Sequence, residues 1–330
     1  MAVTANTNET YDVTTIREDL SEAMASISPT ETLLMSTIGS RNVDNTYFEW
    51  SEVDLAATGA NRQIEGDVGL SNTAPTNAVR KGGYTQISAK VVEVSSTNQA
   101  VNGVANAQTV AKQVAYKLSE LKRDMEAMLL SNVAANAGAS GTARATAGLP
   151  AYLTSNVSRG GSGANGTTSG SGESGFVNAA ATDGTLRPIT EALLKTIIAS
   201  CWNAGATPKV VMCGSAQKQK ISTFTGNATR YKEAEDSKLN AAIDVYISDF
   251  GEVQIAPNRH MRVRTVSSVD YTPDVLVLDP SYAEVTYLQT AKQEALAKTG
   301  LSERRLISCE YGLQVTSQKA HGIVADINAS

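Results

Sequence analysis

The sequence predicts an α+β protein, and three observations carry this prediction. Two strand-like segments, Thr46 to Leu55 and Tyr84 to Ser95, flank a long stretch punctuated by Gly and Pro, which indicates a long hairpin with an elaborate tip. Residues Ala107 to Asn132 repeat apolar side chains at helical spacing. A helix, strand, helix pattern begins near Pro188 and indicates a compact α/β unit.

Composition limits the classes of protein to consider. The chain has 330 residues, of which 42% are hydrophobic and 18% charged, with a net charge of -5. Charged residues fall below the roughly 25% typical of soluble domains, which suits a surface largely covered by other protein. No stripe of Lys and Arg could follow a phosphate backbone, so we expect only loose, nonspecific contact with nucleic acid. The start of the chain lacks a secretory signal and no stretch could span a membrane, so we expect a cytoplasmic site of synthesis and no membrane partner.

The first half of the chain is predicted to be extended. Residues 1–38 mix short amphipathic pieces with polar breaks and are typical of an arm. An isolated two-stranded ribbon is marginal in water, so the hairpin needs support. The residues alone leave two sources of this support open, which are another copy of the chain and the body of the same chain.

The helix predicted over Ala107 to Asn132 is one-sided. Its apolar stripe is expected to face the core and comprises Val110, Val114, Leu118, Leu121, Met125 and Met128. The charged residues off this stripe are expected to form a solvated or interface face, and they are Lys112, Lys117, Lys122, Arg123 and Glu126.

The second half alternates helices and strands. A helix over 188–205 precedes a buried strand, Lys209 to Cys213, and a second helix. IDVYISDFGEVQIAPNRHMRVR predicts two strands joined near Phe250 and Gly251, and DVLVLDP predicts an apolar strand from Asp274 to Asp279. The tail contains further strands in YAEVTYLQ, RRLISCEYGLQVTS and HGIVADI, with QEALAKTGLSE as a polar connection between the first two. We expect these late strands to pack with the long helix.

Residues Gly161 to Gly166, GSGANG, match the G-x-G-x-x-G pattern that holds a dinucleotide pyrophosphate. That pattern binds phosphates when a buried strand precedes it and a helix follows, because the phosphates sit on the free amides of the helix N-terminus. Neither neighbour is predicted here, and the surrounding SRGGSGANGTTSGSGESG contains enough Gly to match by composition. A solvent-exposed surface insertion is therefore favoured over a cofactor loop.

Cysteine and histidine give no recognisable site. Cys201, Cys213 and Cys309 are far apart and odd in number, which argues against a disulfide framework or a zinc site built on close Cys pairs. Cys309 falls on the buried alternation of a strand and is predicted to be a core residue. His260 and His321 lie in no ligand spacing, so a satisfied or exposed histidine is favoured for each.

A turn that could bind a phosphate and a group of acidic residues are also assigned structural roles. The turn at Gly214 and Ser215 lacks the remaining residues of a phosphate loop, so a plain helix N-cap is favoured. Glu233, Glu235 and Asp236 lie in a hydrophilic run, for which a solvated face is the default. We predict no enzyme activity and no catalytic, cofactor-binding or metal-binding residues.

The order of these parts resembles the major capsid protein of a tailed bacteriophage with the HK97 fold, and most closely the SU10-type major head protein family. The resemblance covers nearly the whole chain. Its most specific stretches are AYKLSELKRDMEAMLLSN, GLPAYL, VVMCGSAQKQKISTF, VQIAPNRHM and EYGLQVTSQKAHGIVADI.

The resemblance implies a shell-forming protein and a set of segments. These are an N-terminal arm (1–38), an extended loop lying across a neighbouring subunit (39–104), a peripheral domain with the spine helix (105–150), a Gly/Ser-rich insertion (151–184), an α/β axial domain (185–280) and returning peripheral strands (281–330). The implied partners are further copies in pentamers and hexamers, with scaffold, portal and decoration proteins and packaged double-stranded DNA as additional candidates. The implied location is the virion, after assembly in the host cytoplasm.

Single residues receive roles only as hypotheses. Phe48 and Trp50 are expected to anchor the hairpin to the spine helix of a neighbour. Some capsids of this fold crosslink a Lys to an Asn, which would need a Lys near the hairpin tip; Lys81 is the available position, and we predict that it does not crosslink. The alternatives to a capsid protein are a cytoplasmic nucleotide-binding enzyme using GSGANG and another virion component such as a tail-tube subunit.

Overall fold

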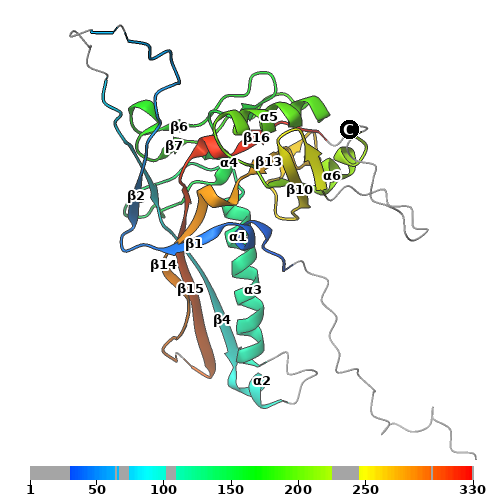
Figure 1. The fold of residues 1–330 in the computed structure, drawn as a ribbon. Helices are drawn as coiled ribbons and strands as arrows, with labels where there is room; N and C mark the ends of the chain where they lie inside the picture. Colours follow the sequence, from blue (N-terminus) through cyan, green and yellow to red (C-terminus); the bar gives the residue numbers. More distant parts are fainter. Residues whose placement is uncertain are drawn as a thin grey trace, which may run out of the picture.

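The computed structural model describes residues 30–63, 65–66, 74–101, 109–224, 245–298 and 300–328. It contains an elongated part, in which one helix lies along a narrow sheet, and a compact unit built on a wider sheet (Figure 1). The elongated part is called the arm below and is distinct from the N-terminal segment 1–38. A hairpin leaves the body where the two parts meet. This is the α+β architecture predicted from the sequence.

The arm is a four-stranded sheet with one helix on one face. The helix is α3, Val110–Leu129, which confirms the helix predicted there. The strands, in their order across the sheet, are β1 (Gly39–Asn42), β14 (Ala283–Ala295), β15 (Ser302–Val315) and β4 (Gln86–Ser95). Only the β1 to β14 pairing is parallel. Leu121, Met125 and Leu129 of α3 share a buried core with the sheet.

The hairpin prediction is wrong in its second strand. β2 (Tyr47–Glu52) pairs with β3 (Val79–Tyr84), whereas the predicted partner is β4, which pairs with β15 along Gln86 to Ser95. The physical reason is burial: β4 turns Val92 and Val94 toward α3, and a free ribbon would leave both in water. A short helix, α2 (Ser96–Ala100), ends this strand, and the Ser95 side chain caps it.

The compact unit is a six-stranded sheet covered on both faces. Its strands, in order, are β5 (Val157–Ser158), β16 (Gly322–Val324), β13 (Val275–Leu278), β8 (Val210–Cys213), β10 (Gly251–Pro257) and β9 (Val245–Ser248). One face packs on α5 (Glu191–Asn203) and α6 (Ser215–Ile221), and the other shares the core of the arm. The predicted helices and the strands of 245–278 are confirmed in type and order.

The tail divides between the two sheets. β15 packs on α3, as predicted for the late strands. β16 instead pairs with β13 and β5 in the second sheet, so the prediction that all late strands pack with the long helix is wrong for this one. β14 also continues to Ala295, which shortens the predicted polar connection. The same half of the chain also contains the pair β11 (Arg264–Val266) and β12 (Val269–Tyr271) and the 3-10 turns η4 (Pro280–Tyr282) and η5 (Gln318–Ala320).

The Gly/Ser-rich segment is folded into the body rather than simply displayed on it. It begins in α4 (Leu149–Tyr152) and carries β5, β6 (Thr167–Thr168), η3 (Ser171–Glu173) and β7 (Val177–Ala179). The side chain of Asp326, buried and at φ 60°, accepts hydrogen bonds from the backbone N–H groups of Gly160 (2.9 Å) and Gly184 (2.8 Å) and from Arg264 (3.0 Å). The expectation of a solvent insertion is therefore wrong for the two ends of this segment.

Two glycines of the Gly/Ser-rich segment lie where two stretches of backbone pass close to each other. A Cβ on Gly160 would lie 2.0 Å from the carbonyl oxygen of Thr185, and a Cβ on Gly184 would lie 2.6 Å from the carbonyl oxygen of Gly160. No side chain fits at either position without moving backbone. Within GSGANG the residues Gly161, Ser162, Ala164 and Asn165 are exposed, and the chain continues into β6 rather than into a helix. The arrangement differs from the strand, loop and helix of a dinucleotide-binding turn.

One buried carboxylate joins three parts of the fold. Glu126 of α3 is fully buried and accepts hydrogen bonds from the backbone N–H groups of Leu34 (2.6 Å) and Met35 (3.0 Å). These groups belong to the first turn of α1 (Leu33–Thr37), which has no cap from its own Thr32 side chain. The amide of Asn258, which follows β10, donates a third hydrogen bond at 2.8 Å. The expectation that Glu126 lies on a solvated face is wrong, because its carboxylate caps a second helix.

Candidate functional site

The base of the hairpin is buried against its own subunit. Phe48 and Trp50 of β2 are stacked with ring centroids 5.9 Å apart, and Trp50 lies 6.5 Å from the ring of Tyr152 in α4. Both side chains are buried, so the prediction that they anchor the hairpin to a neighbouring subunit is wrong. A Cβ on Gly83 or on Gly312 would lie 2.8 Å from the ring of Phe48, so two glycines make room for it. The body of the same chain therefore supports the ribbon.

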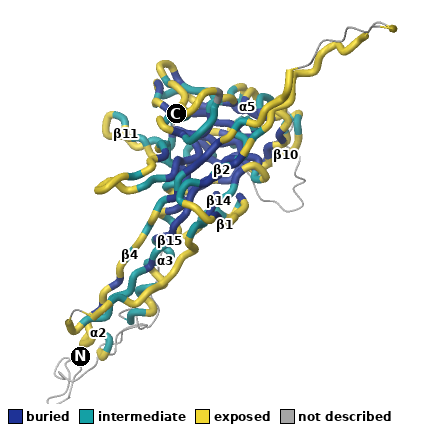
Figure 2. Tube along the Cα trace, turned by 90° about the vertical axis from the view of Figure 1, so that its left-hand side faces the viewer, coloured by how far each residue is buried: buried dark blue, intermediate teal, exposed yellow. Residues whose placement is uncertain are grey.

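Beyond this base the hairpin is exposed. Every described residue from Val53 to Gln63 and from Ala74 to Ala78 is exposed, and the chain past β2 runs outward as an exposed segment (Figure 2). Val53 is 54% and Leu55 84% exposed, although both are large apolar residues. Near its base the segment is held by an ion pair between Asp54 and Lys319 of the tail, and beyond it the exposed apolar side chains offer a surface to another molecule.

The arm exposes a second surface. Its sheet is covered by α3 on one face only, and on the other face Ile87 and Val91 of β4 are 60% and 46% exposed. On the covered side, Lys90 reaches across to α3 and forms ion pairs with Asp124 (2.7 Å) and Glu120 (3.3 Å). β4 is also an edge strand with no further strand beside it in the described part of the chain. Exposed apolar side chains on an open edge are typical of an interface.

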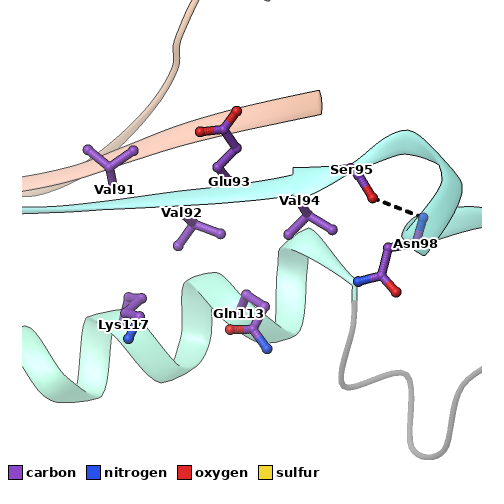
Figure 3. Close-up of a pocket in the computed structure, with 8 residues that line it drawn as sticks. All are labelled: Val91, Val92, Glu93, Val94, Ser95, Asn98, Gln113 and Lys117. Atoms are coloured by element: carbon purple, nitrogen blue, oxygen red, sulfur yellow. Dashed lines mark hydrogen bonds between the residues drawn. The ribbon is translucent and has the colours of Figure 1, made fainter. Parts of the chain in front are cut away.

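A groove of about 340 Å³ opens between β4 and the first turns of α3. Figure 3 shows Val92 and Val94 directed from β4 toward the helix, with Gln113 and Lys117 facing them from α3. The ammonium of Lys117 is paired with Glu120 at 2.8 Å. No cysteine or histidine is among the described residues that line the groove.

The cysteines are core residues. Cys201, Cys213 and Cys309 are free thiols buried in the two sheets and α5, and Cys309 is 2% exposed, as predicted for this strand. Burial raises the pKa of Cys201 and Cys213 to about 12 and that of Cys309 to about 11. Since the thiolate is the reactive and metal-binding form, these environments disfavour both kinds of chemistry.

The other residues considered for chemistry lie apart from one another. His260 follows β10 and its backbone N–H donates to Asn258, whereas His321 precedes β16. Gly214 is the N-cap residue of the short α6, where Thr272 occupies the space beside it. Glu233, Glu235 and Asp236 fall outside the described residues. In the described part of the chain, no group of three His, Cys, Asp or Glu could hold a metal ion, and no helix is long and apolar enough to cross a membrane.

His321 predicts a pH dependence of stability. Its ring is fully buried, its Nδ1 accepts a hydrogen bond from the backbone N–H of Asp279 at 3.4 Å, and burial lowers its pKa to about 4. Because the unfolded chain binds this proton near pH 6.5, the neutral ring stabilises the fold above that pH, and the stability is lost as the pH falls toward 4. We expect this ring to account for a loss of about 2–3 kcal/mol between pH 7.5 and 4.5.

The measurement is urea unfolding of the wild type and His321→Gln at both pH values. The variant is expected to lose less stability over this interval, although it starts from a lower value because it disturbs a buried site. Equal losses in the two proteins would show that His321 does not carry the effect.

The arm, the six-stranded sheet covered on both faces and the projecting hairpin together form an HK97-type fold. Two solved structures align over nearly the full chain. One from Mycobacterium phage Bobi has a TM-score of 0.60 at 11% identity and covers 97% of this chain and 98% of that one. The capsid of a native GTA particle has a TM-score of 0.61 at 14% identity and covers 96% and 97%. At such low identity the likeness establishes the fold.

Sequence establishes the family. The family model described as SU10 major capsid protein matches residues 3–328, so the chain belongs to the SU10 major capsid protein family. The major capsid protein of Escherichia phage Phieco32 is 32% identical over 109 residues, which are 33% of this chain and 31% of that protein. The match therefore spans about a third of the length of that relative.

Sequence reasoning missed the residues that fix the hairpin base. Lys81, Glu52 and Glu173 form a cluster of ion pairs there. Lys81 lies in β3 rather than near the hairpin tip, so the position considered for a crosslink is wrong, while the prediction that it does not crosslink stays a prediction. A lysine beside two glycines in RKGGY, within a segment otherwise read as loop, is the one signal that could have marked this strand.

Proposed function

We propose that this chain is the major head protein whose copies assemble into the icosahedral shell around a phage genome. The observation that carries the proposal is the family match, which extends over residues 3–328. The fold supports it, because the capsid of a native GTA particle aligns with 96% of this chain. The exposed hairpin and the uncovered face of the arm sheet supply surfaces for contacts between copies.

The proposal divides the chain by role. The arm of α3 and its sheet acts as the peripheral part, and residues 86–100, which pair and pack there, belong with it rather than with the extended loop. The six-stranded sheet unit acts as the axial part around five-fold and quasi-six-fold axes, with β5 and β16 included. The segment from β2 to β3 acts as the extended loop that lies across a neighbour.

The partners follow from the same role. Copies of this chain would form pentamers and hexamers, and scaffold, portal and decoration proteins are further candidates. Packaged DNA would meet the inner face loosely, since the chain carries a net charge of -5. We also propose that the chain has no enzyme activity and that assembly takes place in the host cytoplasm before the virion leaves the cell.

Expression of the chain alone tests the proposal. Size-exclusion chromatography with light scattering, followed by negative-stain microscopy, is expected to show shells, tubes or rings of five and six subunits. A monomer or dimer that persists at high concentration would contradict self-assembly by this chain.

A further inference from the structure

The only lysine described in the hairpin strands is buried at the point where the hairpin leaves the body. Lys81 lies opposite Trp50 in the β2 to β3 ladder, and its side chain is 9% exposed. Its ammonium forms an ion pair with Glu52 of β2, whose side chain is 10% exposed, and a second with Glu173 at 3.3 Å. Removing one partner of a buried ion pair is strongly destabilising, so these two contacts hold the Lys81 side chain in place.

The backbone makes a matching connection. The N–H of Gly82 donates to the carbonyl of Gly175 at 2.9 Å, and the N–H of Gly175 donates to the carbonyl of Arg80 at 2.9 Å. These two bonds join β3 to the segment 173–175 as a parallel bridge at Lys81. Glu173 and Gly175 have φ of 65° and 79°, a left-handed conformation that turns this segment against β3.

Glu173 is itself held from two other directions. Its Oε1 accepts hydrogen bonds from the hydroxyl of Thr154 (3.2 Å) and from the side-chain amide of Gln318 (3.1 Å). The carbonyl oxygen of the same Gln318 side chain accepts from the backbone N–H groups of Thr154 and Ser155, both at 3.1 Å. The cluster thus connects the hairpin to the segment after α4 and to the tail before β16.

The cavity beside this cluster is too small for a ligand. It has a volume of about 20 Å³ and is lined by Lys81, Tyr152, Glu173 and Gln318 among others. Sites for small molecules usually measure roughly 300–1,000 Å³. The cavity leaves no room for a ligand, and the polar groups around it bond to one another. These two facts favour a role in holding the hairpin over a role in binding.

We propose that Lys81 is a positioning residue that fixes the direction in which the hairpin leaves the body, acting through Glu52 and Glu173. The cluster is the last buried point before the exposed residues 53–63 and 74–78. Loosening it changes the angle of the whole exposed segment while the core of the subunit stays intact. The consequence for shells rests on the proposed function, because the hairpin must reach the same place on every neighbour.

Hydrogen exchange on unassembled subunits tests this role directly. In Lys81→Met, peptides covering 47–52, 79–84 and 173–177 are expected to exchange about tenfold faster than in the wild type, while peptides of α3 and β15 exchange at the wild-type rate. Lys90→Met is the matched control, because Lys90 also bridges two carboxylates, but between β4 and α3. It is expected to loosen the arm and leave the hairpin peptides unchanged.

A milder variant covers the case in which Lys81→Met fails to fold. Glu173→Gln changes the more exposed side of the cluster, 38% exposed, and is expected to speed exchange of the same peptides about threefold. Wild-type exchange in the hairpin peptides of these variants, or an equal effect of Lys90→Met, would overturn the proposal. Shell assembly of each protein is scored separately by microscopy, with a broader spread of particle diameters expected for Lys81→Met. Failure of the wild type to form shells would count against the proposed function and leave the exchange result standing.

Discussion

Excision of residues 56–76, closed by a short Asn-Gly turn, is expected to give a folded subunit that forms no closed shell. The ladder of β2 and β3 ends at the pair Glu52 and Val79, so the excision leaves all paired residues in place. Every described residue within 56–76 is exposed, so no buried apolar contact among them is lost. Thermal unfolding is expected to change by only a few degrees. Light scattering and microscopy then report whether shells form.

Two control variants distinguish the length of the hairpin from its contribution to the stability of the subunit. A Gly/Ser linker of the same length restores the span but not the side chains, and it should also fail if contacts made by the hairpin hold the neighbour. A longer excision that includes β3 removes the buried residues Lys81, Gly82 and Gly83 and is expected to prevent folding. Normal shells from the chain lacking 56–76 would refute the role proposed for the hairpin.

The second large effect is expected for Glu126→Ala, which should lower the free energy of unfolding by about 3–5 kcal/mol. The substitution leaves the N–H groups of Leu34 and Met35 and the amide of Asn258 without their acceptor. A buried donor without a partner costs about 1–3 kcal/mol, and here three are affected together. Urea unfolding at neutral pH measures the change.

Two carboxylate variants calibrate this result. Glu126→Gln keeps the shape and one acceptor oxygen and is expected to lose less than half as much. Glu120→Ala removes a carboxylate from the same helix that is 29% exposed and paired with Lys117, so a loss below about 1 kcal/mol is expected. A Glu126→Ala protein within about 1 kcal/mol of the wild type would show that α1 is held by other contacts.

Glu126 also shows which contacts the local sequence does not predict. The apolar spacing of α3 predicts a helix, which is confirmed, and a buried side, which is confirmed for Leu121 and Met125 in the core, whereas Leu129 takes the place in the core that was predicted for Met128. A glutamate beside that stripe is assigned to water by default, because an ionised group is seldom buried without partners. Its partners come from residues 91 and 92 positions earlier and 132 positions later, and local spacing does not reveal them.

The second strand of the hairpin was predicted wrongly for a similar reason, because its contacts also come from distant parts of the chain. β3 contains Gly82 and Gly83, which read as loop residues. In the structure they are strand residues because aromatic rings of β2 lie over them: a Cβ on Gly82 would be 2.3 Å from the hydroxyl of Tyr47. Lys81 meets Glu173 at a separation of 92 positions through the Gly/Ser-rich segment, whose composition predicted only a surface insertion. Contacts between segments, rather than the character of each segment, decided these cases.

The pairing of β4 with β15 determines when the arm can be completed during biosynthesis. Ser302 and Glu93, which meet at the far end of this pairing, are separated by 209 positions in the chain. A ribosome that adds about 5–20 residues per second needs roughly 10–40 seconds to produce the second strand after the first. During that interval β4 and α3 precede β15 in the order of synthesis, so we expect the sheet to lack the strand that completes it. We therefore expect nascent chains to be incompetent for association until synthesis is nearly finished, so that only completed subunits enter a growing particle.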